Sequence, residues 1–127
     1  MKRRITQSIY VGNVEVGGNS KITVQSMTKT DTRDVESTIY EIKLLEEAGC
    51  EIVRCAVPDI EAAKALKEIK KQSKIPIVAD IHFHHQIAIE SMKSGVDCLR
   101  LNPGNIRDPE KVKMVVKEAK ERNIPIR

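Results

Sequence analysis

Residues 51–80 read EIVRCAVPDIEAAKALKEIKKQSKIPIVAD, and this stretch decides the fold class. Its two ends, residues 51–56 and 75–80, are short apolar runs of the kind that form strands buried in a parallel sheet. The segment between them, residues 59–71, has apolar side chains at helical spacing. Its inward positions are Ala62, Ala63, Leu66 and Ile69. A strand, an amphipathic helix and a second strand in this order predict βα units in a parallel sheet covered by helices.

The same alternation continues on both sides of this stretch. Further strand-like runs lie at residues 22–26, 97–102 and from 124 onward. Ahead of them, two short β-branched runs flank the pair Gly12-Asn13, which favours a tight turn with positive φ values. The sequence therefore predicts five strand starts in the βα series and a separate hairpin before it.

Helix signals stand between the predicted strands. In the helix that covers residues 35–45, Asp31 or Thr32 is the expected N-cap and Gly49 the expected end. A shorter helix is expected from about residue 85 to before residue 95. The last helix is expected to begin at Pro109 and to bury a stripe consisting of Val112, Val115, Val116 and Ala119.

The fold class predicted from this series is α/β. A closed barrel of eight βα units needs about 250 residues, whereas this chain has 127. The series therefore predicts parallel βα units that form roughly the first half of a TIM barrel, preceded by a short N-terminal β-hairpin. Residues 1–127 are expected to be one partial-barrel domain. The spacing by itself also allows a doubly wound sheet.

Composition and charge narrow the classes of partner. The chain is 40% apolar and 31% charged, which is typical of a soluble domain, and it lacks an apolar secretory run after its basic start. The formal net charge is +4, but the basic residues mostly stand among acidic ones. We therefore expect a cytoplasmic protein with neither a nucleic-acid nor a membrane partner.

The three cysteines, Cys50, Cys55 and Cys98, are not predicted to bind metal. Their number is odd and they lack the close pairing of a zinc or cluster motif. Each lies in or beside an apolar run, where a thiol packs as a small hydrophobic group. Reduced, buried thiols are the expected state.

Polar residues gather at the carboxyl ends of the predicted strands, where α/β proteins bind ligands. Because side chains alternate along a strand, the polar residues within a strand share one face. In a barrel, arginines from strands two, four and five would converge near the mouth and favour a multiply charged anion such as a diphosphate. The candidate ligand-binding residues are Arg54, Asp80, His82, Arg100, Asn102 and Arg127.

Two alternatives to an anion site remain open on these residues. Each arginine could instead pair with a carboxylate such as Asp80, or lie on the outer face. The run from Asp80 to His85 also contains imidazoles that could bind a hydrolytic metal. Only Asp80 and His82 share a strand face there, so hydrogen bonding to substrate or acid-base chemistry is the preferred role.

Several segments resemble the motif series of the 4-hydroxy-3-methylbut-2-enyl diphosphate synthases. The match runs from residue 4 to residue 127 and follows the order of the family. Its segments are VQSMT (24–28), TDT (30–32), AG (48–49), IVR (52–54), VADIHF (78–83) and LRLNPGNI (99–106).

This resemblance implies a TIM barrel related to pterin-binding barrels, joined in the family to a C-terminal domain with a [4Fe-4S] cluster. The family reductively opens 2-C-methyl-D-erythritol 2,4-cyclodiphosphate in isoprenoid biosynthesis, as a homodimer, with electrons from flavodoxin or ferredoxin. The cluster ligands are expected to be absent from this chain. By position, the family's diphosphate-binding arginines correspond to Arg54, Arg100 and Arg127, and its polar contacts to Asp80, His82 and Asn102. A half-barrel that binds phosphorylated ligands without chemistry, or an assembly fragment, is the alternative function.

Overall fold

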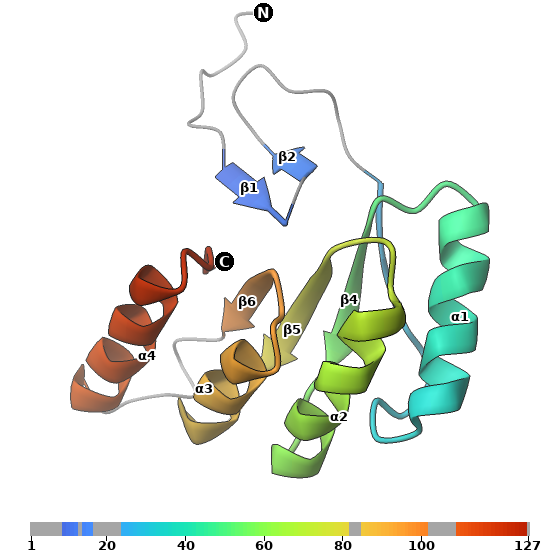
Figure 1. The fold of residues 1–127 in the computed structure, drawn as a ribbon. Helices are drawn as coiled ribbons and strands as arrows, with labels where there is room; N and C mark the ends of the chain where they lie inside the picture. The colour runs from blue at the N-terminus through green and yellow to red at the C-terminus, as the bar shows by residue number, and fades with distance from the viewer. Residues whose placement is uncertain (1–8, 13, 17–23, 82–84, 102–108, 127) are drawn as a thin grey trace, which may run out of the picture.

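A computed structural model describes residues 9–12, 14–16, 24–81, 85–101 and 109–126. Within this part, four parallel strands form one sheet in the order β3-β4-β5-β6, so each strand pairs with its successor in the sequence. The strands are β3 (Gln25–Met27), β4 (Ile52–Ala56), β5 (Ile77–Ile81) and β6 (Cys98–Leu101). The helices are α1 (Val35–Glu47), α2 (Ile60–Gln72), α3 (His85–Lys93) and α4 (Pro109–Glu121). The helices lie along one face of the sheet (Figure 1), which confirms the predicted βα series.

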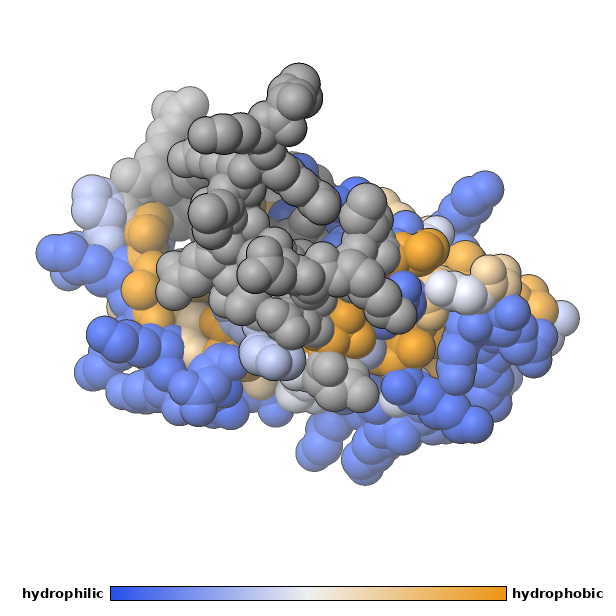
Figure 2. Space-filling model, turned by 90° about the horizontal axis from the view of Figure 1, so that it is seen from above, coloured by the Kyte–Doolittle hydropathy of each residue, from blue (hydrophilic) through white to orange (hydrophobic). Residues whose placement is uncertain are grey.

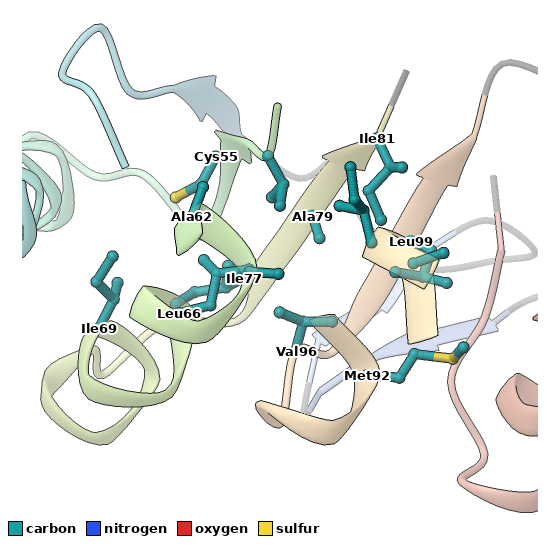
Figure 3. Close-up of a cluster of buried hydrophobic side chains, with 14 of the residues drawn as sticks. Cys55, Ala62, Leu66, Ile69, Ile77, Ala79, Ile81, Met92, Val96 and Leu99 are labelled. Carbon is teal, nitrogen blue, oxygen red and sulfur yellow. The ribbon is translucent and has the colours of Figure 1, made fainter. Parts of the chain in front are cut away.

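The main core fills the space between the sheet and the helices (Figure 3). Alternate strand residues point toward the helices, among them Cys55 of β4, Ala79 of β5 and Leu99 of β6. They pack in one cluster with Leu66 of α2 and Met92 of α3, and all five side chains are at most 1% exposed. The predicted inward positions of α2 are confirmed, since Ala62, Ala63, Leu66 and Ile69 are all fully buried.

Helix α1 begins later than the sequence predicted. Its N-cap is Asp34, whose carboxylate accepts a hydrogen bond from the backbone N–H of Ser37 (3.3 Å). The expected caps have other partners: the Asp31 carboxylate binds Arg33, and the Thr32 hydroxyl donates to a carbonyl of β4. The prediction of Asp31 or Thr32 as the cap was therefore wrong.

Gly49 ends α1 as predicted. Its φ of +98° is in the left-handed region, which glycine adopts without the steric cost that a Cβ adds. The N–H of Gly49 bonds to the carbonyl of Glu46 (3.0 Å), and the N–H of Cys50 bonds to the carbonyl of Leu45 (2.9 Å). These two bonds make a Schellman motif, which satisfies the last carbonyls of the helix.

The inward stripe of α4 is narrower than predicted. Val115 and Ala119 are buried and Val112 is half-buried, but Val116 is 48% exposed. Val116 follows Val115 by about 100° around the helix axis, so it lies at the border of the buried face. The prediction was wrong for this residue.

The fifth predicted strand is represented by one bridge within the described residues. Ile126 pairs with Leu99 in parallel, and the N–H of Leu99 donates to the carbonyl of Pro125 (3.0 Å). The chain after α4 therefore returns beside β6, in the direction expected of the next strand.

The predicted hairpin is formed by β1 (Ile9–Val11) and β2 (Val14–Val16), which pair antiparallel. It lies at the end of the sheet where the strands begin (Figure 1). Val11 is fully buried and belongs to a second cluster, with Ile52, Val78 and Cys98 of three successive strands. The hairpin therefore covers the amino-terminal part of the sheet face that is turned away from the helices.

Gly12 allows the close approach of this hairpin. Its φ is +60°, as the predicted turn requires. A Cβ atom at this position would lie 2.9 Å from Cγ of Pro76 and 3.0 Å from Oδ1 of Asp97. A larger residue would therefore push the hairpin away from the sheet.

Charged side chains occupy the outward helix faces, as at Lys64, Lys67 and Lys71 of α2. Figure 2 looks onto the hairpin end and shows hydrophilic residues along much of the margin, with hydrophobic residues nearer the middle of this face. Among the helices in the described ranges, none has both the length and the apolar character needed to span a bilayer.

Candidate functional site

Three polar residues lie together near the carboxyl ends of the strands. They are Arg54 of β4, Asp80 of β5 and Arg100 of β6. The parallel register pairs Asp80 with Arg100 directly and with Ala56, two residues after Arg54. Alternation along each strand then places all three on the face opposite the helices, two residues further along the strands than the cluster that the hairpin covers. On this face, the fold thus has an apolar layer near the amino ends of the strands and a charged layer nearer their carboxyl ends.

Asp80 is shared between the two arginines. Its Oδ1 accepts a hydrogen bond from Nη1 of Arg100 (2.9 Å), and its Oδ2 lies 3.5 Å from Nε of Arg54. The Asp80 side chain is only 3% exposed, whereas those of Arg54 and Arg100 are 37% and 43% exposed. A buried carboxylate therefore holds two guanidinium groups that remain accessible to solvent.

This trio keeps capacity to bind an anion. Two guanidiniums and one carboxylate leave a formal charge of +1. A guanidinium has five N–H donors, so one carboxylate cannot satisfy the donors of both arginines. The Nε of Arg54 is buried and makes no hydrogen bond within the described residues, whereas the Arg54 side chain as a whole is 37% exposed. Planar N–H groups in such an arrangement match phosphate oxygens.

The structure brings together three of the six predicted site residues. Arg54, Asp80 and Arg100 share one cluster, and the alternative in which the arginines pair with Asp80 is confirmed for both of them. His82, Asn102 and Arg127 lie outside the described residues, and their roles remain predictions.

Glu41 of α1, to which no sequence pattern pointed, holds the loop after β3. Its carboxylate accepts hydrogen bonds from the backbone N–H groups of Lys29 (2.7 Å) and Thr30 (3.2 Å). The hydroxyl of Thr32 ties the same loop to the carbonyl of Ala56 at the end of β4 (2.6 Å). A half-buried helix carboxylate such as Glu41 carries no sequence signal for such a role, because loop geometry decides it.

Arg33 connects this loop to the next one. Its guanidinium bonds to the Asp31 carboxylate (2.7 Å) and to the carboxylate of Asp59 (3.3 Å), which is also the N-cap of α2. The hydrogen bonds from Arg33 lower the pKa of the exposed Asp31 carboxyl to about 2. The loop after β3 and the loop between β4 and α2 are thus linked at the carboxyl ends of these strands.

Comparison with known protein families matches residues 6–127 to the GcpE TIM-barrel domain. The chain belongs to this family. The 4-hydroxy-3-methylbut-2-en-1-yl diphosphate synthase (flavodoxin) of Dehalococcoides mccartyi is 63% identical over 125 residues, which cover 98% of this chain and 36% of the relative. The synthase of the same name from Clostridium acetobutylicum is 60% identical over 127 residues, covering 100% of this chain and 36% of the relative. The chain thus spans about a third of the length of these relatives.

The fold of the GcpE domain is shared with a solved barrel. The 7,8-dihydropteroate synthase of Vibrio fischeri superposes with a TM-score of 0.69 at 14% identity, over 95% of this chain and 48% of that one. At this identity the likeness concerns the fold alone. It supports a TIM-barrel fold of which this chain forms a portion, since the match covers about half of the solved chain.

The cysteines of this GcpE domain do not fit an iron-sulfur cluster. Cys55 belongs to the core beside the helices, whereas Cys98 lies on the opposite face of the sheet, beside Val11. All three cysteines are buried thiols outside any disulfide, as predicted. Burial raises the pKa of the Cys55 thiol to about 11, which disfavours the thiolate that binds metals. Within the described ranges, no group of three or more His, Cys, Asp or Glu residues could hold a metal ion.

We expect the three thiols to be protected from modification in the folded chain. Iodoacetamide should label Cys50, Cys55 and Cys98 on the order of 100-fold more slowly at pH 8 than in denaturant, because modification requires local opening and a thiolate. Mass spectrometry after timed quenching measures the rates. Rapid native labelling of Cys55 would contradict its burial in the core.

Proposed function

We propose that residues 1–127 form part of the substrate-binding barrel of a 4-hydroxy-3-methylbut-2-enyl diphosphate synthase. The proposed ligand is 2-C-methyl-D-erythritol 2,4-cyclodiphosphate. One observation carries the proposal: Arg54 of β4 and Arg100 of β6 lie on one face of the sheet, on either side of β5, and both are held by the buried Asp80 of β5. The names of the relatives, which describe such synthases, support it.

In this proposal, the chain binds and orients the anionic part of the substrate. Arg54 and Arg100 donate hydrogen bonds to diphosphate oxygens in a partly desolvated site, where charge-assisted bonds are strong. Asp80 remains beneath them and fixes the direction of both guanidiniums, which reduces the entropy that binding would otherwise cost. His82, Asn102 and Arg127 are proposed to add contacts from the same mouth.

The complete reaction needs more than this set of residues. The proposed synthase would open the ring reductively, and a [4Fe-4S] cluster supplied with electrons by flavodoxin or ferredoxin would provide the redox chemistry. The thiols of this chain are unsuited to hold that cluster, so we assign no redox step to them. A homodimer in the cytoplasm is the proposed assembly and location of the whole enzyme.

Titration of the chain with the cyclic diphosphate by calorimetry tests this function. We expect saturable binding with one ligand per chain, weakening as NaCl is raised, because the contacts are charged. The phosphate-free polyol 2-C-methyl-D-erythritol is the control and is expected not to bind. Absence of binding by a chain whose circular dichroism shows it folded, or equal binding of the polyol, would contradict the proposal.

A further inference from the structure

An apolar side chain lies directly beside the arginine pair. Met27 of β3 is the register partner of Arg54, so the two residues share the face of the candidate site. The Sδ atom of Met27 lies 3.6 Å from Nη2 of Arg54, which donates toward it. Met27 is nevertheless 36% exposed. A flexible thioether therefore forms an open wall next to one guanidinium.

This wall borders a cavity of its own. The cavity has a volume of about 180 Å³ and is lined by Gln25, Ser26, Met27 and Arg54. A cavity of roughly 150 Å³ is large enough for a molecule the size of benzene, so this space has room for a carbon skeleton of a few atoms, within a lining that is partly polar. Its lining offers one apolar surface, polar groups from Gln25 and Ser26, and a cation at its border.

The two groups at the border favour different parts of one ligand. A guanidinium binds phosphate oxygens, whereas a thioether is a weak acceptor that packs against carbon. A ligand with its anionic group on Arg54 would therefore place an attached carbon skeleton against Met27. A bare inorganic anion would make no use of this wall.

We propose that the cavity beside Met27 is a subsite for the small aliphatic, hydroxylated portion of a phosphorylated ligand, and that Met27 selects for that portion. This inference rests on the proposed function, because it needs the phosphates on Arg54 and Arg100. Met27 makes the site prefer an organic diphosphate over inorganic diphosphate.

Two ligands and three substitutions at one position test the subsite. Calorimetry with the cyclic diphosphate and with inorganic diphosphate is compared for the wild-type chain and for Met27→Ala, Met27→Gln and Met27→Leu. We expect the alanine and glutamine variants to bind the cyclic diphosphate about 5- to 10-fold more weakly. Inorganic diphosphate should be unaffected, and the leucine variant should stay within about 2-fold of wild type for both ligands.

Val24→Ala is the matched control, since Val24 is 52% exposed on the same edge of the sheet but does not line the cavity. It should leave both affinities unchanged. Parallel weakening of both ligands by Met27→Ala would mean that Met27 acts only by positioning Arg54, which overturns the inference. Unchanged binding of both ligands would overturn it as well, while leaving the anion site intact. If neither ligand binds the wild-type chain, the proposed function fails and the subsite with it.

Discussion

Replacing Arg100 with alanine is expected to weaken binding of the cyclic diphosphate by roughly 100-fold. A hydrogen bond to a charged group contributes about 1.5–3 kcal/mol, and this substitution removes such a donor. It also removes the guanidinium that lies 2.9 Å from Oδ1 of Asp80, so that less positive charge offsets this buried carboxylate beside the incoming phosphates. The formal charge of the trio falls from +1 to 0. Calorimetric titration measures the change.

Arg122→Ala is the control for this prediction. This substitution removes the same charge at a distant place. Arg122 follows α4 and lines a cavity with Gly12 at the hairpin end of the molecule. Its guanidinium pairs with the carboxylate of Glu118 (2.8 Å). We expect less than about a 2-fold change there, because exposed distant charges are screened. Arg100→Lys should fall between the two, near 10-fold, because lysine keeps the charge but loses the planar fork. Equal losses for Arg100→Ala and Arg122→Ala would show a general charge effect and contradict a specific site.

Replacing Leu66 with alanine is expected to lower the free energy of unfolding by about 3 kcal/mol. Leu66 is fully buried between α2 and the sheet, in the cluster with Cys55, Ala79 and Leu99. Truncation removes packed methyl groups and leaves a cavity that rigid strands cannot fill. Urea denaturation followed by circular dichroism measures the loss as a lower midpoint at an unchanged slope.

Leu44→Ala provides a matched comparison, since Leu44 is also a helical leucine but is 48% exposed on α1. The same truncation there should change the free energy of unfolding by less than about 0.5 kcal/mol. Similar losses at the two positions would mean that the core does not lie between α2 and the sheet as described.

Much of the fold could be predicted because short-range chemistry decides it. Hydrophobic periodicity located β4, β5 and β6 to within one or two residues, and the Gly12-Asn13 pair located the hairpin. Gly49 ended α1 because only a residue without Cβ adopts its φ value at low cost. The choice of Asp34 as N-cap was missed, since three nearby polar residues compete and loop contacts select among them.

The candidate site was predictable in its members but not in its pairing. Alternation along the strands placed Arg54, Asp80 and Arg100 on one face before any contact was known. That Asp80 serves both arginines depends on the register between strands, and this register is set by the packing of helices against the sheet. Met27 was missed as a neighbour of Arg54 for the same reason, because it lies 27 residues away in the sequence.

By itself, the sequence determined the order and type of the elements, the face of each strand residue and the family motifs. The elements and the strand faces follow from apolar periods of 3.6 and two residues, and the motifs are short stretches of sequence, so each can be recognised from neighbouring residues alone. Only the tertiary structure decided which charges meet, that a buried carboxylate orients two arginines, and that Val116 stays exposed. Ion pairs and burial depend on distances between segments far apart in the chain, and those distances exist only once the sheet and its helices have packed.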